Sequence, residues 1–289
     1  MRPLAGFGYV RVRSLEEAWA AGDQNPDDAA FLAGGTDLLV KLKKGQIRTS
    51  LLINLKGIPG LCGVQELGNR IEIGALTPIS ELLRSRSLEG KAALLPLAAN
   101  QLGSRQIRNL ATIGGNLCSG SPAADLSIAL LCLQADVKIH GPEGSRVDKL
   151  EAFFKGPGLT SLKPREILGT ISVPIFNGGW AWDYQKLTHR RGMEIGIVNV
   201  AVGLRLEQDV SKEARIALGA VAPTPIRATR AERHITGKKL SPGLIEEVAQ
   251  MAAQESRSID DIRGSAAYRQ EMVMNLIRRA FTRAWASFG

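Results

Sequence analysis

The 289-residue sequence has few of the residues from which metal clusters and nucleophilic active sites are made. Its three cysteines, Cys62, Cys118 and Cys132, are widely spaced and form no C-x-x-C pair, so this chain alone cannot ligate an iron–sulfur cluster. Only three histidines are present, and no G-x-S-x-G, H-E-x-x-H or paired-carboxylate motif occurs. We therefore predict no catalytic residue and no metal site in this chain, and expect its reactivity to come from a bound cofactor.

Long apolar runs are also absent. No uninterrupted run approaches the roughly 18 residues of a membrane-spanning helix, and no apolar core of signal-peptide length precedes Arg11. These absences favour a cytoplasmic location and no transmembrane segment.

Aromatic residues are scarce, at 5% of the chain, and none is interleaved with the basic clusters. A stacking platform for single-stranded nucleic acid is therefore missing, and we expect no nucleic-acid partner despite the net charge of +9. The basic residues are spread along the chain. We interpret their excess as solvated surface and as a field for anionic cofactors.

The arrangement of apolar and turn residues predicts an α+β protein with two domains, residues 1–176 and 177–289, separated by the turn-rich segment 176–180. Ser14 and Glu17 form a capping box at the start of a helix over 14–22. Ser241 and Pro242 start a second helix, and a final helix carries Val273, Ile277, Phe281 and Trp285. Further helices are expected at 81–88 and 94–102, and strands at 51–55, 70–75, 136–140, 167–173, 198–206 and 215–221.

Two glycine-centred segments carry the strongest functional signal. The first is residues 31–38 (FLAGGTDL) and the second begins at residues 111–116 (ATIGGN). Each places a Gly-Gly pair beside hydroxyl or amide side chains, a composition that lets backbone N–H groups approach an anion closely. A tight turn alone explains either pair, but two such loops together indicate a cradle for a pyrophosphate. Neither segment follows the G-x-G-x-x-G pattern, so a Rossmann domain is not expected.

The chain resembles the flavoprotein subunits of the molybdenum-containing hydroxylases, which include bacterial xanthine dehydrogenase, carbon monoxide dehydrogenase, and quinoline and nicotinate oxidoreductases. The resemblance covers nearly the whole chain and is strongest to the xanthine dehydrogenase branch. It rests on residues 33–37, 107–108, 112–116, 121–125, 166–168, 186 and 222–227, which occur in the family's order.

This resemblance implies a two-subdomain FAD-binding domain of the vanillyl-alcohol-oxidase (PCMH) type, followed by a small antiparallel sheet with helices. It also implies non-covalent FAD, with the two glycine segments around the pyrophosphate. Leu168 would pack on the cofactor, Asp125 would accept hydrogen bonds from ribose or adenine, and Lys186 would stabilise negative charge on the reduced flavin. The implied cofactor-binding residues are Phe31, Leu32, Ala33, Gly34, Gly35, Thr36, Asp37, Leu38, Leu102, Thr112, Ile113, Gly114, Gly115, Asn116, Asp125, Leu168 and Lys186.

The resemblance further implies two partners, a small [2Fe-2S] subunit and a large molybdopterin subunit, assembled as a dimer of heterotrimers. The flavin would pass electrons to NAD or another acceptor. Relatives carry Arg-Arg-x-x-Asp-Ile-Ala near the flavin where this chain has residues 190–196 (RRGMEIG), which leaves the acceptor open. Two alternatives stay open as well: a stand-alone flavoenzyme of the same fold, and a non-enzymatic nucleotide-binding module.

Overall fold

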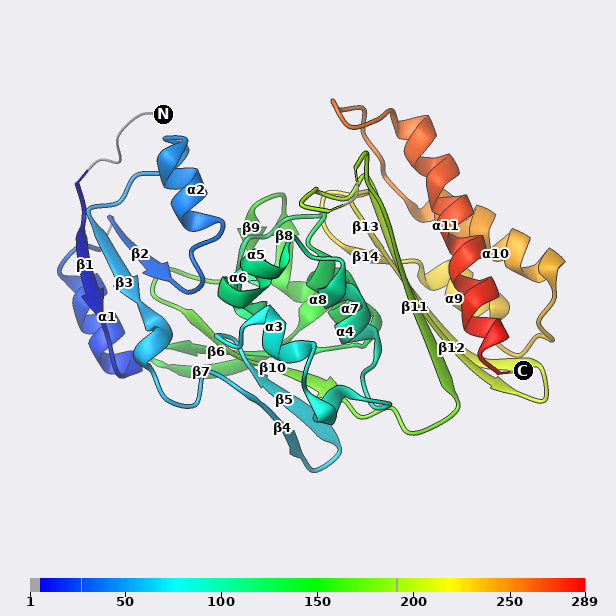
Figure 1. Ribbon diagram of the computed structural model, residues 1–289, viewed down its shortest axis with the longest axis horizontal. Coiled ribbons are helices and arrows are strands. Elements are labelled where there is room, and N and C mark those ends of the chain that lie inside the picture. The colour runs from blue at the N-terminus through cyan, green and yellow to red at the C-terminus, as the bar shows by residue number, and fades with distance from the viewer. Residues whose placement is uncertain (1–5, 27, 191, 289) are drawn as a thin grey trace.

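A computed structural model describes residues 6–26, 28–190 and 192–288. Its N-terminal part is a small parallel sheet, shown in blue at the left of Figure 1. The sheet order is β1 (Gly8–Arg11), β3 (Leu51–Asn54), β2 (Ala29–Leu32), with helices α1 (Leu15–Asp23) and α2 (Leu38–Lys43) and the short η1 (Leu55–Gly57). Ser14 Oγ accepts a hydrogen bond from Glu17 N, which confirms the predicted helix start, while Glu17 Oε2 accepts from Arg13 N.

The second part is a five-stranded antiparallel sheet with helices on one side (Figure 1). Its strand order is β4 (Val64–Leu67), β5 (Arg70–Gly74), β10 (Ile167–Pro174), β6 (Asp136–Gly141), β7 (Gly144–Lys149). The helices are α3 (Ile79–Leu82), η2 (Arg86–Leu88), α4 (Leu94–Asn100), α5 (Arg105–Leu110), α6 (Ile113–Cys118), α7 (Asp125–Cys132) and α8 (Leu150–Phe153), and a hairpin joins β8 (Phe154–Gly156) to β9 (Leu159–Thr160). Every residue of α7 is buried, so this helix is the centre of the core.

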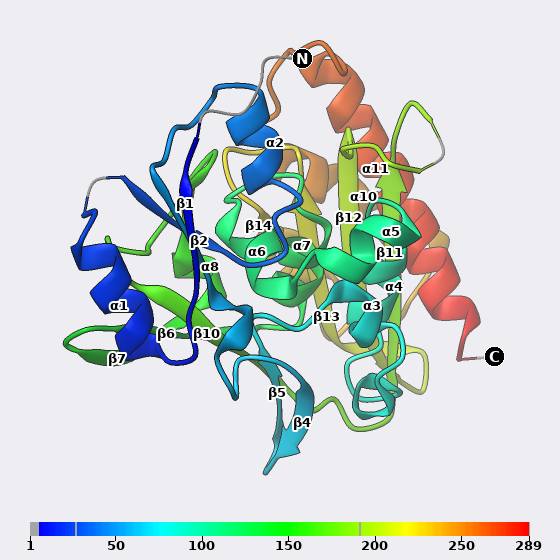
Figure 2. The ribbon, with the colours of Figure 1, turned by 60° about the vertical axis from the view of Figure 1, so that its left-hand side comes forward.

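The C-terminal part is an antiparallel sheet between two helical layers (Figures 1 and 2). Its strands are β11 (Trp180–Leu187), β12 (Val198–Glu207), β13 (Val210–Gly219) and β14 (Ile226–Arg227), and its helices are α9 (Thr229–Ile235), α10 (Pro242–Glu255) and α11 (Ala266–Ala286). Alternate residues face opposite sides of the sheet. Tyr184, Ala201 and Ala217 join the core around α4 and α7, whereas Val200 and Val202 pack with α10 and α11.

The α+β prediction is confirmed, and most predicted elements lie within a few residues of their expected positions. The prediction of one helix over 81–88 is wrong, because the chain forms only α3 and the single turn η2 there. Leu82 and Leu88 are both fully buried. In one continuous helix these residues would point about 120° apart, so the break brings both into the core. None of the described helices is long and apolar enough to cross a membrane. The boundary between residues 176 and 177 stays a prediction.

Candidate functional site

The first glycine segment, residues 33–37, joins the end of β2 to the start of α2. Gly35 has φ +77°, in the left-handed region that glycine adopts without strain. A Cβ on Gly34 would lie 2.1 Å from the carbonyl oxygen of Leu110, so this segment packs directly against the end of α5. Among the described residues, no acceptor is recorded for the backbone N–H groups of Gly35, Thr36 and Asp37. These donors are therefore available to an anionic group.

The second glycine segment is the first turn of α6 rather than the expected loop. Thr112 caps this helix, and its Oγ1 accepts a hydrogen bond from Gly115 N at 3.0 Å. Gly114 N donates to Ala75 O at 2.8 Å, and a Cβ on Gly114 would lie 2.6 Å from that oxygen. The glycine thus lets α6 begin against the chain that follows β5. Asn116 Oδ1 is buried and has no hydrogen-bond partner in the described chain.

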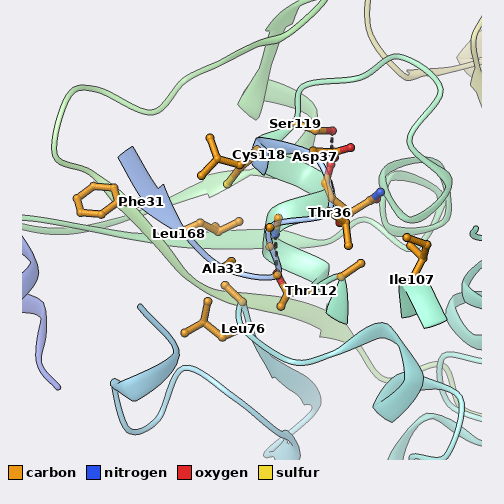
Figure 3. A pocket seen from close by; sticks show the side chains of 18 of the residues that line it. Phe31, Ala33, Thr36, Asp37, Leu76, Ile107, Thr112, Cys118, Ser119 and Leu168 are labelled. Atoms are coloured by element: carbon orange, nitrogen blue, oxygen red, sulfur yellow. Dashed lines mark hydrogen bonds between the residues drawn. The ribbon is translucent and has the colours of Figure 1, made fainter. Parts of the chain in front are cut away.

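A cavity of about 560 Å³ lies between the two glycine segments, within the size range of ligand sites. Figure 3 shows Thr36 and Asp37 of the first segment, Thr112 of the second, and the apolar Phe31, Leu76 and Leu168 around it. The predicted residues that line the cavity are Phe31, Ala33, Gly34, Gly35, Thr36, Asp37, Leu38, Leu102, Thr112, Gly114, Gly115, Asn116 and Leu168. Most of the residues predicted from the sequence therefore line the same cavity.

The chemistry of the wall fits FAD. Free backbone N–H groups and Lys41 supply donors and positive charge for a pyrophosphate, while Leu76, Ile107 and Leu168 supply apolar surface for flat rings. The buried, unpartnered Asn116 Oδ1 is an acceptor that a hydroxyl or ring N–H of the cofactor would satisfy. No cluster of three or more His, Cys, Asp or Glu suited to a metal ion occurs among the described residues.

Two ionisable residues on the wall have perturbed pKa values. Cys118 is exposed because it opens onto the cavity, but protein surrounds it on its other sides, and this desolvation raises the pKa of the thiol to about 12. The Arg146 guanidinium, 2.8 Å from Glu166 Oε2, lowers the pKa of that carboxyl group. Glu166 is thus held as an anion at the edge of the cavity.

Asp125 and Lys186 form a buried ion pair that is not part of the cavity wall. Lys186 Nζ lies 2.9 Å from Asp125 Oδ2 and also donates to Gln101 O. Tyr184 Oη donates to Asp125 Oδ1 at 2.7 Å, and Asn199 Nδ2 donates to Tyr184 Oη at 3.0 Å. Burial raises the pKa of Asp125 while Lys186 opposes that shift. As direct flavin contacts, both residues stay a prediction.

Leu32 and Ile113 are also absent from the cavity wall, and both side chains are buried. Sequence reasoning missed Lys41 and Leu76 as wall residues, because no local pattern marks which side chains of α2 and of the segment after β5 face the cavity. The loop that differs from the family pattern does contribute Met193, Glu194 and Ile195. Arg191 in this loop lies outside the described residues.

Comparisons with known proteins cover nearly the whole chain. Residues 5–176 match the family described as "FAD binding domain in molybdopterin dehydrogenase", and residues 183–284 match "CO dehydrogenase flavoprotein C-terminal domain". The fold and the cavity thus define an FAD-binding α+β protein. The chain belongs to the family of FAD-binding medium subunits of molybdenum hydroxylases.

Several branches of that family are similarly related to it. The chain is 33% identical over 280 residues to the carbon monoxide dehydrogenase medium chain of Hydrogenophaga pseudoflava (97% of each chain). It is 32% identical over 275 residues to the glyceraldehyde dehydrogenase medium chain of Sulfolobus acidocaldarius (95% of this chain, 97% of the relative). It is 30% identical over 284 residues to a putative xanthine dehydrogenase FAD-binding subunit of Escherichia coli (97% of each chain). The solved carbon monoxide dehydrogenase of H. pseudoflava superposes with a TM-score of 0.95 at 33% identity, covering 99% of each chain. Identity alone therefore does not single out a substrate.

Proposed function

We propose that this chain is the electron-relay subunit of a molybdenum hydroxylase. It takes electrons from the [2Fe-2S] clusters of a small partner subunit and passes them through FAD to NAD or another acceptor. Substrate oxidation takes place on a large molybdopterin subunit, in a dimer of heterotrimers located in the cytoplasm. The observation that carries this proposal is the cavity between the two glycine segments, with its free N–H groups and the unpartnered Asn116 Oδ1.

The chain's own residues bind, orient and shield the cofactor. The N–H groups of Gly35 and Thr36 would hold the pyrophosphate, and Asn116 Oδ1 would accept a hydrogen bond from the cofactor. Leu76 and Leu168 exclude water from the ring face. When bound, FAD supplies the electron-transfer chemistry, and the protein positions it.

Replacing Asn116 with Ala tests the cavity as the FAD site. We expect the dissociation constant for FAD to rise about 10- to 100-fold, because a buried hydrogen bond worth about 1–3 kcal/mol is lost. The measurement is a titration of the apoprotein with FAD, followed by flavin fluorescence. Asn69→Ala, at an exposed turn, is the matched control and should bind FAD as the wild type does. Unchanged affinity in Asn116→Ala would place the cofactor elsewhere.

A second experiment tests whether substrate oxidation requires the partner subunits. We expect the isolated chain to carry flavin absorption and to pass electrons from NADH to an artificial dye, without oxidising any purine or N-heterocycle. Hydroxylation should appear only when the iron–sulfur and molybdopterin subunits are added. Substrate turnover by the isolated chain would instead establish a stand-alone flavoenzyme. A purified protein with bound nucleotide but no flavin spectrum would establish a nucleotide-binding module.

A further inference from the structure

A second hollow, of about 380 Å³, lies where α3 meets α5, outside the FAD cavity. These two helices contact each other, and Figure 1 shows them in the middle of the molecule, away from the C-terminal helices α10 and α11. We call it the arginine pocket, because three of its six lining residues are arginines. The lining residues are Ser80, Leu83, Arg84, Arg105, Arg108 and Asn109.

The positive charge of the arginine pocket is not neutralised by the described chain. No carboxylate lines it, and none of Arg84, Arg105 and Arg108 takes part in an ion pair between described residues. Arg84 Nε donates to Ser80 O, and Arg108 Nη1 donates to the carbonyls of Asn100 and Leu102. Each guanidinium has five N–H donors, so most of them remain available. Three like charges that converge on one hollow repel one another unless an anion lies between them.

The arginine pocket and the FAD cavity share helix α5. Ile107 on this helix lines the cavity, while Arg105 and Arg108 line the pocket. Arg108 also holds the carbonyl of Leu102 at 2.9 Å, and Leu102 lies on the cavity wall. Anything bound in the arginine pocket is therefore separated from the cofactor site only by α5 and the segment before it.

We propose that the arginine pocket docks carboxylate side chains of the iron–sulfur partner subunit, an inference that rests on the proposed function. Guanidinium groups bind carboxylates in a bidentate, oriented way and are enriched at protein interfaces. The electron donor is the partner that must approach the flavin, and a contact on α5 places it against the cavity wall.

The test uses the full chain, affinity-tagged and purified from its own host together with the subunits it binds. One variant carries Arg84→Glu and Arg105→Glu, which reverses two exposed charges and leaves Arg108 to hold its carbonyls. The matched control carries Arg86→Glu and Arg233→Glu, which changes the net charge equally at two exposed arginines outside the pocket. Flavin, iron and molybdenum are measured in each eluate.

We expect the iron-to-flavin ratio of the Arg84/Arg105 variant to fall at least about tenfold, because the introduced carboxylates would repel the carboxylates of the partner across the interface. Its flavin content and melting temperature should equal those of the control, which should keep its iron.

Retention of iron by the Arg84/Arg105 variant would overturn the docking role. Loss of molybdenum with iron retained would assign the pocket to the large subunit and also overturn it. Binding of inorganic phosphate is measured by calorimetry. If only the Arg84/Arg105 variant loses phosphate binding while the subunits still assemble, the arginine pocket is a site for small anions and the docking role is overturned. A wild-type eluate with flavin but no iron would overturn the proposed function itself.

Discussion

At the residue scale, Gly34 determines whether the N-terminal part can lie against the rest of the FAD-binding region. We expect Gly34→Ala to lower the free energy of unfolding by about 1–3 kcal/mol and to weaken flavin retention. A Cβ at this position would meet the backbone oxygen of Leu110 at 2.1 Å, and backbone cannot move aside as a flexible side chain can. The measurements are urea unfolding and flavin content. Gly178→Ala, where no atom lies within 4 Å, is the control. Equal stability of the two variants would contradict this account.

Cys118 leads to a second prediction, on the attachment of the cofactor. We expect FAD to be released by acid precipitation, which leaves a colourless pellet. The raised pKa of about 12 keeps the Cys118 thiol protonated at neutral pH, so little of the nucleophilic thiolate exists to form a bond with the flavin. Cys118→Ser should leave flavin binding and release unchanged. Colour that stays in the wild-type pellet but not in the Cys118→Ser pellet would show a covalent bond.

The glycine segments could be predicted from the sequence because their signal is local. A Gly-Gly pair beside Thr36 or Thr112 is visible without any knowledge of the fold. The reason why positions 34 and 114 require glycine could not be predicted in the same way. A Cβ on Gly34 would clash with Leu110 and a Cβ on Gly114 with Ala75, and both of these neighbours are distant in sequence. The hydrogen bonds that Asp125 accepts could not be predicted for the same reason, because their donors Tyr184 and Asn199 come from the C-terminal sheet.

At the scale of elements, local propensity was a weaker guide. Gly114 and Gly115 are poor helix formers, yet α6 includes both, because the Thr112 cap and the contact of Gly114 with Ala75 stabilise that turn. The long helices α10 and α11 were predicted from signals that lie within the helices or next to them: the Ser241 cap of α10 and the apolar stripes of both. Strand β11 went unnoticed although Trp180, Trp182 and Tyr184 alternate along it.

The loop before α11 gives a prediction on pH dependence. Arg263 donates to Asp261 and, together with Arg269, lowers the pKa of Asp261 to about 2. Arg269 is 1% exposed, and its Nη1 also holds the carbonyls of Ile197 and Ala220. Asp261→Asn would leave this buried charge without its counter-ion, so we expect the free energy of unfolding to fall by about 3 kcal/mol at neutral pH.

The sign of the pH effect follows from the lowered pKa. A carboxyl group with a folded pKa below its unfolded value of about 3.9 stabilises the fold above that pH, and this contribution is lost as the pH falls toward 2. The difference between wild type and Asp261→Asn should therefore be full at pH 7 and shrink between about pH 4 and pH 2. Urea unfolding across this range measures it, with the exposed Asp209→Asn as control. A difference that stays constant down to pH 2 would contradict the assignment.

At the scale of the whole molecule, the two predicted domains share one of the buried clusters. Tyr184, Ala201 and Ala217 of the C-terminal sheet pack in the same buried cluster as Leu95 and Leu131 of α4 and α7. The Asp125–Lys186 ion pair and the Tyr184–Asp125 hydrogen bond also cross between the two parts. Residues 1–176 therefore depend on the C-terminal sheet to cover α4 and α7, even though the family matches divide the chain near the same position.

Truncation tests this dependence. We expect residues 1–176, produced alone, to aggregate or to bind a hydrophobic dye, and to retain no FAD, because the apolar side of α4 and α7 would face water and Asp125 would lose both Lys186 and Tyr184. Co-expression with residues 177–289 should restore a soluble, yellow complex, which controls for damage caused by the cut itself. Size-exclusion chromatography and flavin absorbance measure both outcomes. A monomeric 1–176 fragment that unfolds cooperatively and keeps its FAD would show instead that the first domain folds on its own, and that the C-terminal sheet serves other contacts.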